Sequence, residues 1–362
     1  MSSSRDTRPF GFLLRVAVFA LVFAGSAEVW FRVAMPADQM PVNYQEHPST
    51  ISRYDPNGPT SGLCTYGRLC LRMGRWRVND AGWISGVDYV PAADRSRPLV
   101  ALIGDSYIAG TQTDVGQQVD AYVREMLHTD CYSFGVAGWY LEQYVAVSRY
   151  VGRRFEPDVV VVFLDSGSVV SSLRENGVVS PFLWQIRARG DSFEEVAPTA
   201  AYVAGYKKRL AIKSALVRYL RYNAQLTLPG METANIPQPG SDGSGVEQDL
   251  LPAAEFMVDR LCGQSPGTPI VFVARGDSAR YLPVGDVPHV PLPPDAAAVE
   301  VACKGRPQCS FIDLRYAFTR DWAAHHVRFE AADRAHWNAY ANRLVARTLV
   351  DFLVENRLLE RP

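Results

Sequence analysis

The chain has 362 residues, of which 48% are hydrophobic and 21% are charged, a composition that excludes collagen, a coiled coil or a disordered chain. Its 37 lysines and arginines are balanced by 38 aspartates and glutamates. Because no basic excess is available to neutralise a phosphate backbone, nucleic acid is excluded as a partner. Six cysteines are too few for a disulfide scaffold in a chain of this length.

The N-terminal segment has the architecture of an export signal. A short polar and basic head, residues 1–9, precedes residues 10–34, which are apolar except for Arg15, Glu28 and Arg32. A helix needs about 20 apolar residues to cross a bilayer, so the two arginines would have to extend towards opposite interfaces. We expect residues 10–34 to form an uncleaved transmembrane anchor.

The charge of the head sets the expected orientation. Basic residues on the short N-terminal side hold the head in the cytoplasm and place the rest of the chain in the periplasm or outside the cell, anchored to the inner membrane. Two alternatives remain open. One is a cleaved signal peptide, since Gly25 and Ala27 are small residues suited to a cleavage site, and the other is a buried core helix.

Export makes disulfides available to the cysteines. Cys64 and Cys70 form one close pair in the sequence, and Cys303 and Cys309 form another, each within a loop that contains glycine or proline. Both pairs are candidate disulfides, and the alternative is that all the thiols are reduced. Zinc is disfavoured because no histidine lies at ligand spacing near either pair.

The chain after the anchor divides into two parts by composition. Residues 35–95 are rich in proline, glycine and asparagine, and are expected to be an irregular extension packed on the main domain, residues 96–360. The main domain is expected to contain an insertion at 180–250. Within that insertion, the basic, amphipathic pattern of residues 203–227 predicts a single helix that faces solvent. The alternative is that this helix lies on a membrane surface. Residues 229–246 suggest a flexible excursion.

From residue 98 onward, short apolar runs alternate with amphipathic stretches. A continuous apolar run bounded by polar residues is typical of a parallel strand covered on both faces. The pattern predicts a three-layer α/β/α sandwich with about five parallel strands, of the doubly wound, flavodoxin-like kind. The expected strands are 99–103, 131–134, 159–164, 269–274 and 310–314, and the last helix is expected at 337–355.

Ligands of such sheets bind at the carboxyl ends of the strands, so residues that follow strands are the candidates for chemistry. Ser106 follows the first strand within Gly-Asp-Ser, where a hydroxyl is presented above the sheet edge. The same tripeptide recurs at Ser192 and Ser278, but in weaker contexts. A serine nucleophile needs a base and a group that orients the base, and Asp333 with His336 supplies both just before the last helix.

These motifs resemble those of the SGNH hydrolases, also called the GDSL family. Residues 103–106 (IGDS) match the first family block, residues 134–139 (FGVAGW) the second, and residues 333–338 (DRAHWN) the fourth. The Trp-Asn after the histidine is similar to membrane-anchored, exported members and to the alginate O-acetyltransferase branch. The resemblance covers about residues 76–357. It implies a catalytic triad of Ser106, His336 and Asp333, and oxyanion donors at Ser106 and Gly138.

The third block departs from the family. Its members carry an asparagine after the third strand, whereas this chain places Gly167 at that position, between Ser166 and Ser168. The loss of one oxyanion donor typically lowers turnover about a hundredfold to a thousandfold. Gly167 and Ser168 are included in the expected oxyanion site, and Ser166 or Asn176 are the other candidate donors.

The resemblance implies an exported serine esterase or O-acyltransferase that acts on ester groups, above all O-acetyl groups, of cell-envelope or extracellular glycans. Lipid esters remain open, as does the choice between hydrolysis and transfer. No cofactor or metal is expected, because no phosphate-binding loop follows a strand. Partners are expected to be the acylated substrate, the membrane and proteins of polysaccharide assembly. The alternatives are a degenerate relative that binds an acylated glycan or envelope partner without turnover, and a structural envelope protein.

Overall fold

Five parallel strands form the central sheet of the computed structural model, which describes residues 8–47, 50–173, 181–190, 192–226, 250–276 and 281–360. The strand order is β11-β10-β7-β5-β6, so the chain starts beside the centre, adds β6 on one side and then crosses to build the other side. The predicted three-layer α/β fold is confirmed. The strands are β5 (Leu99–Gly104), β6 (Asp130–Gly135), β7 (Val159–Leu164), β10 (Ile270–Ala274) and β11 (Cys309–Asp313).

Every residue of the central strands β5 and β7 is buried, which explains their continuous apolar sequences. Successive side chains of a strand point to opposite faces, and both faces here are covered by helices. Val160 and Val162 of β7 belong to the core on one side of the sheet, whereas Val159 and Val161 belong to the core on the other side. The pattern of unbroken valines thus follows from the two-sided burial.

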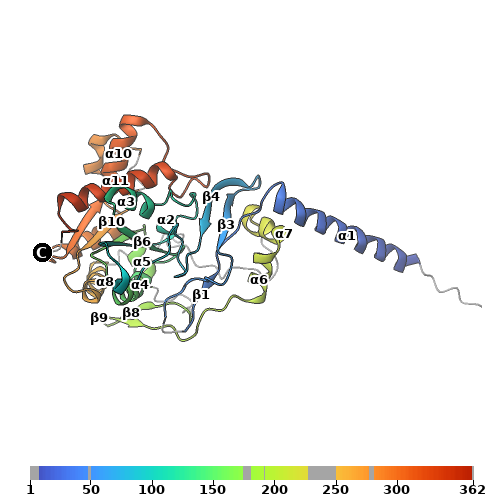
Figure 1. Ribbon diagram of the computed structural model, residues 1–362, viewed down its shortest axis with the longest axis horizontal. Coiled ribbons are helices and arrows are strands. Elements are labelled where there is room, and N and C mark those ends of the chain that lie inside the picture. Colours follow the sequence, from blue (N-terminus) through green and yellow to red (C-terminus); the bar gives the residue numbers. More distant parts are fainter. Residues whose placement is uncertain are drawn as a thin grey trace, which may run out of the picture.

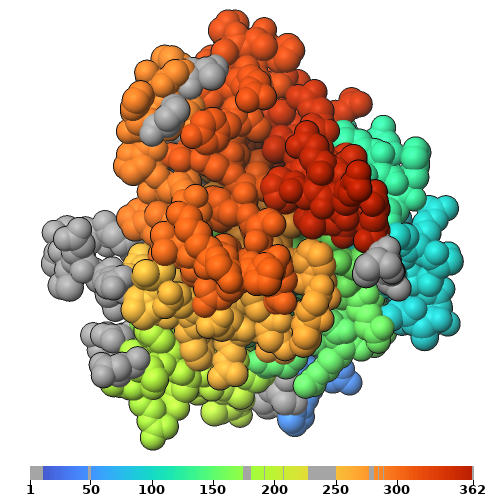
Figure 2. Space-filling view, turned by 90° about the vertical axis from the view of Figure 1, so that its left-hand side faces the viewer, coloured from blue at the N-terminus to red at the C-terminus, as the bar shows by residue number. Residues whose placement is uncertain are grey.

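Two helical layers cover the sheet. One consists of α4 (Leu141–Phe155), α8 (Leu251–Gln264) and α9 (Pro294–Cys303), and the other of α3 (Val119–Leu127), α10 (Leu314–His325) and α11 (Ala339–Glu355). Figure 2 looks onto the face on the far side from α1, where the C-terminal third of the chain, in orange and red, covers the centre and top. The short elements are α2 (Ser106–Ala109), α5 (Ser168–Ser172), η1 (Ala92–Asp94) and η3 (Val284–His289).

The segment before β5 is more regular than the sequence predicts. It contains two antiparallel pairs, β1 (Asn43–Tyr44) with β2 (Arg53–Tyr54) and β3 (Ser61–Tyr66) with β4 (Leu71–Arg77). Such two-stranded ladders are too short and too interrupted by glycine for a clear period-2 pattern.

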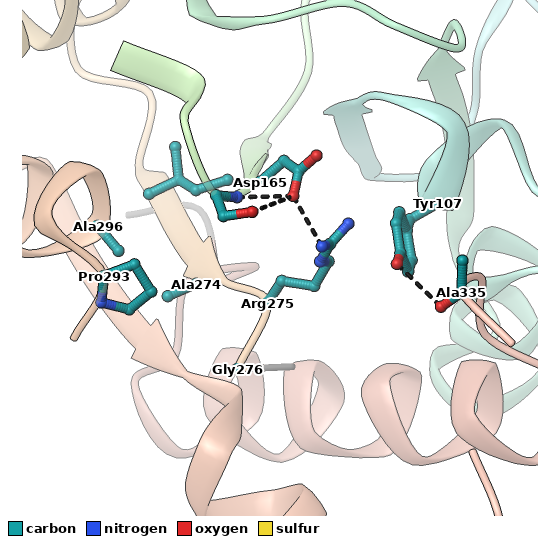
Figure 3. A pocket seen from close by; sticks show the side chains of 10 residues that line it. Tyr107, Asp165, Ala274, Arg275, Gly276, Pro293, Ala296 and Ala335 are labelled. Carbon is teal, nitrogen blue, oxygen red and sulfur yellow. Dashed lines mark hydrogen bonds and ion pairs between the residues drawn. The ribbon is translucent and has the colours of Figure 1, made fainter. Parts of the chain in front are cut away.

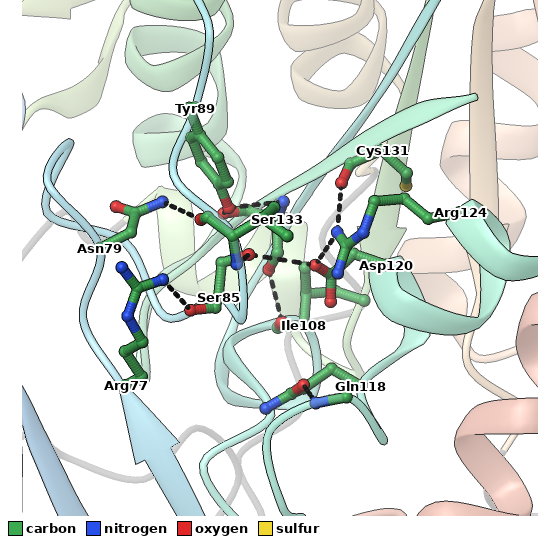
Figure 4. Close-up of polar contacts among 12 residues, drawn as sticks. Arg77, Asn79, Ser85, Tyr89, Ile108, Gln118, Asp120, Arg124, Cys131 and Ser133 are labelled. Atoms are coloured by element: carbon green, nitrogen blue, oxygen red, sulfur yellow. Dashed lines mark hydrogen bonds and ion pairs between the residues drawn. The ribbon is translucent and has the colours of Figure 1, made fainter. Parts of the chain in front are cut away.

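Polar contacts attach this segment to the sheet (Figure 4). The Tyr89 hydroxyl donates to the Ser133 carbonyl at 2.7 Å and accepts from the Ser133 N–H at 2.9 Å, and the Ser133 hydroxyl donates to the Ile108 carbonyl at 2.6 Å. Ile108 lies in α2, the helix that begins at Ser106. The N-terminal extension therefore supports β6 and, through Ser133, the helix α2 that begins at the candidate nucleophile.

The insertion corrects one expectation. Residues 203–227 do not form a single helix: α6 (Tyr206–Lys213) ends at Ser214, whose hydroxyl caps α7 (Ala215–Arg218), and a π-helix, η2 (Tyr219–Asn223), follows. A serine side chain that binds a backbone N–H ends one helix and starts the next. The insertion also contains the hairpin β8 (Gln185–Arg189) with β9 (Ser192–Val196). The predicted excursion at 229–246 lies outside the described residues.

The N-terminal helix α1 (Arg8–Val33) projects from the body of the molecule (Figure 1). Its stretch Gly11–Val33 is long and apolar enough to serve as a membrane anchor or a signal sequence. Most of its large apolar side chains are exposed, among them Phe19, Leu21 and Phe23. A helix that leaves such side chains uncovered is not a core helix, so that alternative is wrong.

The two predicted disulfides are absent, since all six cysteines lie in the described part of the chain and are free thiols. Cys309 Sγ lies 3.1 Å from Cys262 Sγ of α8, so strand β11 carries this thiol to a helix that the sequence did not suggest as its neighbour. Cys64 and Cys70 are buried, and burial raises the pKa of both thiols. A protonated, buried thiol is a poor nucleophile for disulfide formation.

Candidate active site

The site lies where the strand order reverses. β5 and β7 are neighbours, but the chain visits β6 between them, so their carboxyl ends flank a switch point of the kind that binds ligands in open α/β sheets. Ser106 follows β5 directly and begins α2. Of the other two Gly-Asp-Ser serines, Ser192 begins the exposed hairpin strand β9, and Ser278 lies outside the described residues.

The structure brings Ser106, His336 and Asp333 together across 230 residues of sequence. The Ser106 Oγ lies 2.9 Å from the His336 Nε2, and the His336 Nδ1 lies 2.5 Å from the Asp333 Oδ2. The hydroxyl can donate to one ring nitrogen while the other donates to the carboxylate. This is the relay in which a base removes the proton of a nucleophile and a carboxylate holds the base in the required tautomer.

The loop before α11 is shaped by Asp333 itself. One carboxylate oxygen, Oδ1, accepts from the N–H groups of Ala335 and His336 at 3.0 and 3.1 Å, which leaves the other oxygen for the imidazole. Burial opposes the ionisation of Asp333, but the hydrogen bonds from His336 and Ala335 outweigh it and lower the pKa of the carboxyl. Asp333 is therefore charged where it faces His336.

Aromatic packing holds the imidazole from the side. The Tyr107 ring lies 4.9 Å from the His336 ring and 4.9 Å from the buried Trp337 ring, and its hydroxyl donates to the Ala335 carbonyl at 2.9 Å. Asn338 then caps α11 by accepting from the Ala341 N–H. The Trp-Asn that follows the histidine in the sequence thus fixes the loop, in a role that the motif alone did not reveal.

The turn that presents Ser106 contains a buried carboxyl. The Asp105 side chain accepts from the Tyr107 N–H at 2.9 Å and so caps α2. Burial, together with repulsion from Asp165, raises the pKa of Asp105 to about 6, although Arg275 opposes the shift. An ionised Asp105 therefore carries a free-energy cost in the folded protein.

The two expected oxyanion donors, the N–H groups of Ser106 and Gly138, lie in the turns that follow β5 and β6. The N–H of Ser106 opens α2, where helical N–H groups have no intrahelical partner. Gly138 has a φ of +78°, and a Cβ at this position would meet nothing within 4 Å, so its left-handed backbone rather than crowding requires glycine. Gly135 is required by crowding, since a Cβ there would lie 2.3 Å from the Ala109 nitrogen of α2.

The Ser168 hydroxyl, expected as an oxyanion donor, is engaged in its own turn. It is fully buried, donates to the Asp165 carbonyl at 2.8 Å and accepts from the Asp165 N–H at 2.9 Å, so it closes its own turn. Gly167 has a φ of +84° and is the N-cap residue of α5, where it has no side chain to accept a hydrogen bond. Asn176 lies outside the described residues.

The N-terminus of α5 is also occupied. The N–H groups of Val169 and Val170 both donate to the Asp295 Oδ1, at 2.7 and 2.9 Å. Asp295 comes from α9, which the sequence does not connect with this turn. Several polar groups of the turn after β7 thus have hydrogen-bond partners within the protein. In the SGNH family that the motifs resemble, such a turn supplies an oxyanion donor.

A pocket of about 410 Å³ opens beside the triad and is bordered by the neighbours of both reacting residues, Tyr107 and Ala335 (Figure 3). Arg275, directly after β10, lies in it between Asp165 and Tyr107: its guanidinium is 2.8 Å from the Asp165 carboxylate and 3.9 Å from the centre of the Tyr107 ring. Sequence reasoning missed Arg275, although its place after a predicted strand was a usable signal. Small and apolar residues, Leu164, Ala274, Pro293 and Ala296, form one wall, and Ser166 and Gly276 complete the lining.

No family model and no curated protein matches the chain. Solved structures similar to it include TesA, at 12% identity over 72% of this chain and 99% of that chain with a TM-score of 0.38. A lipase/acylhydrolase from Enterococcus faecalis is 14% identical over 73% of this chain and 100% of that chain, with a TM-score of 0.37. An acetyl xylan esterase from Butyrivibrio proteoclasticus is 13% identical over 77% of this chain and 68% of that chain, with a TM-score of 0.35. At similarities this low, the activity has to be inferred from the site itself.

Proposed function

We propose that the protein is an exported serine esterase or O-acyltransferase that acts on ester groups, chiefly O-acetyl groups, of cell-envelope or extracellular glycans. The observation that carries the proposal is the hydrogen-bonded chain from the Ser106 Oγ through His336 to Asp333, with separations of 2.9 and 2.5 Å. A serine, an imidazole and a carboxylate in this order form an activated nucleophile.

The reaction follows from these positions. His336 Nε2 takes the proton of Ser106 as its Oγ attacks the ester carbonyl, and the N–H groups of Ser106 and Gly138 receive the developing oxyanion. His336 then donates its proton to the leaving alkoxide, which departs as the sugar hydroxyl and leaves an acyl group on Ser106. Water or a second hydroxyl, deprotonated by His336, attacks this acyl-enzyme and releases a free acid or a new ester.

The pocket is compatible with a small acyl group on a hydroxylated substrate. Its apolar wall includes Ala274, Pro293 and Ala296, a surface suited to a methyl group, whereas Asp165, Ser166 and Arg275 offer donors and acceptors to sugar hydroxyls. The apolar helix α1 supports an exported, membrane-anchored enzyme, with its main domain in the periplasm or outside the cell.

A fluorophosphonate probe tests the proposal directly, because it reacts with activated serines. The full chain in detergent is treated beside Ser106→Ala and His336→Ala, and the adduct is located by mass spectrometry. We expect one adduct, on Ser106, that is lost in both variants. Ser192→Ala is the matched control, since it removes another serine of a Gly-Asp-Ser sequence, in the exposed hairpin, and should leave labelling unchanged.

Labelling is followed by an assay with an O-acetylated oligosaccharide. Released acetate identifies a hydrolase, and acetate transferred to an added unacetylated oligosaccharide identifies a transferase. A folded protein that gives no adduct would contradict the proposal. That result would favour a binding protein without turnover. The turn after β7 supports this alternative, because its polar groups are already hydrogen-bonded within the protein.

A further inference from the structure

The C-terminal end of α1 is joined to the insertion rather than to the sheet. The Glu28 carboxylate accepts from the Ser214 hydroxyl at 2.8 Å and from the N–H groups of Ala215 and Leu216 at 2.9 Å each. A residue of the apolar helix therefore caps the N-terminus of α7. Hydrogen bonds from three groups to one carboxylate define the angle between the two elements more closely than apolar contact would.

Two further contacts in the last turn of α1 strengthen this junction. The Phe31 and Tyr219 rings stack at 3.8 Å, and the Arg32 guanidinium donates to the Lys213 carbonyl at 2.6 Å. Trp30, by contrast, is 56% exposed. Tryptophan is enriched where a membrane helix meets the headgroups, so its position is consistent with the level of the interface.

Residues 203–226 contain six lysines and arginines and no aspartate or glutamate. They also expose apolar surface, since Val203 and Tyr206 are 72% and 77% exposed. Basic residues interspersed with exposed apolar ones are typical of segments that lie on an anionic membrane surface. The basic residues are Lys207, Lys208, Arg209, Lys213, Arg218 and Arg221.

The tip of the β3–β4 hairpin lies beside this segment. The Tyr219 hydroxyl donates to the Arg68 carbonyl at 3.3 Å, and the Asn223 amide donates to the Gly67 carbonyl at 3.2 Å. At this tip Leu69 is 74% exposed and Leu71 52% exposed. We call residues 66–71 and 203–226 together the anchor-side face, and Figure 1 shows both parts at the base of α1.

The apolar part of α1 sets the level of this face relative to a bilayer. Residues 10–27, uncharged except for Arg15, span about 27 Å as a helix, close to the thickness of a hydrocarbon core, and the Arg15 side chain has to extend towards the opposite interface. Glu28 and Arg32 follow at once, and charged groups are costly within the core but not at its edge. The elements bound to Glu28 and Arg32 must then lie at the headgroups.

We propose that the anchor-side face binds the bilayer surface from which α1 emerges, with the exposed Arg209 and Lys213 on anionic lipid headgroups and Leu69 and Tyr206 in the interface. This contact and α1 together hold the catalytic domain in one orientation to the membrane. The proposal needs α1 to remain attached to the domain, but it is independent of the chemistry at Ser106.

Hydrogen exchange of the full chain in lipid nanodiscs tests the proposal. One preparation contains phosphatidylcholine alone, and the other an equal mixture with phosphatidylglycerol. We expect exchange in residues 66–71 and 206–213 to be about tenfold slower in the mixture, because each basic residue near an anionic surface adds to the attraction. Added salt should reduce the difference. Equal exchange in the two lipids would overturn the proposal.

Two double variants separate this contact from a general effect of charge. Arg209→Gln with Lys213→Gln removes two exposed positive charges of the face and should abolish most of the lipid-dependent difference. Arg97→Gln with Lys304→Gln removes two exposed charges that precede β5 and β11, and should preserve it. If both double variants preserve the difference, the assigned face is wrong. Unchanged exchange in β5 shows that each variant is folded.

Discussion

The turns that follow β5 and β7 stand side by side at the carboxyl edge of the sheet, but they use their polar groups differently. After β5, the Asp105 side chain caps α2 and leaves the Ser106 hydroxyl directed at His336. After β7, the Ser168 hydroxyl is bound to the Asp165 backbone at both ends. The comparison shows that the sheet positions two equivalent turns, and that their side chains decide which of them presents a hydroxyl to the histidine.

The largest expected effect comes from breaking the β5 turn. Ser106→Ala or His336→Ala should lower kcat on a fluorogenic acetate ester about 10⁴-fold or more, because the nucleophile or its base is lost. Steady-state kinetics of the full chain measure this change. The double variant should be no worse than either single variant, since the two residues act as one unit. Additive losses would contradict that coupling.

We expect kcat to rise if the β7 turn is made to resemble the corresponding turn of the SGNH family. Gly167→Asn adds an amide at a left-handed position, which asparagine tolerates better than other residues, and should raise kcat about 10- to 100-fold by supplying a third oxyanion donor. The matched control is Gly167→Ala, which has the strained backbone but no amide. Equal kcat values for the two variants would show that the turn does not face the oxyanion.

Asp105, the buried carboxyl of the β5 turn, should affect the stability of the fold as well as turnover. Because the pKa of Asp105 is raised to about 6 in the folded protein, the folded state binds more protons than the unfolded state between about pH 4 and 6. Stability from this group is present below that window and is lost as the pH rises through it.

Asp105→Asn keeps the oxygen that caps α2 and removes the charge. We expect it to raise the free energy of unfolding by about 3 kcal/mol at pH 8 relative to the parent chain, and to leave it nearly unchanged at pH 4. Chemical unfolding at the two pH values measures the difference. A variant that is equally stabilised or destabilised at both would contradict the assigned cause.

The smallest expected effect distinguishes two serines of the β7 turn. Ser166 borders the pocket, so Ser166→Ala should lower kcat/KM about threefold, the value of one hydrogen bond to substrate. Ser168→Ala should leave kcat/KM unchanged but lower the melting temperature, because it leaves the Asp165 N–H without the hydroxyl that accepts its hydrogen bond. The reverse pattern would restore Ser168 as a donor.

The triad could be predicted because its signals are local. Ser106 directly follows an apolar run, and Asp333 and His336 lie three residues apart before an amphipathic helix, so strand and helix periodicity places all three at one edge. Arg275 follows a strand too, but only the neighbouring positions of β10, β7 and α2 bring it against Asp165 and Tyr107.

The errors have a common physical cause. A single helix at 203–227 was expected from periodicity, yet Ser214 ends it because Glu28, far away in sequence, binds the N–H groups that a continuous helix would use. The pairing of Cys309 with Cys303 was expected from sequence separation, yet the sheet places Cys309 next to Cys262. Both outcomes depend on contacts between distant segments.

The sequence by itself determined the apolar N-terminal helix, the three-layer fold and the three residues of the triad, because burial on both sides of a sheet and residues after strands leave local patterns. Tertiary structure alone decided that Ser168 closes its own turn, that Asp295 occupies the start of α5, and that α1 is joined to α7. Hydrogen bonds between segments far apart in the chain leave no periodicity, so only the folded arrangement reveals them.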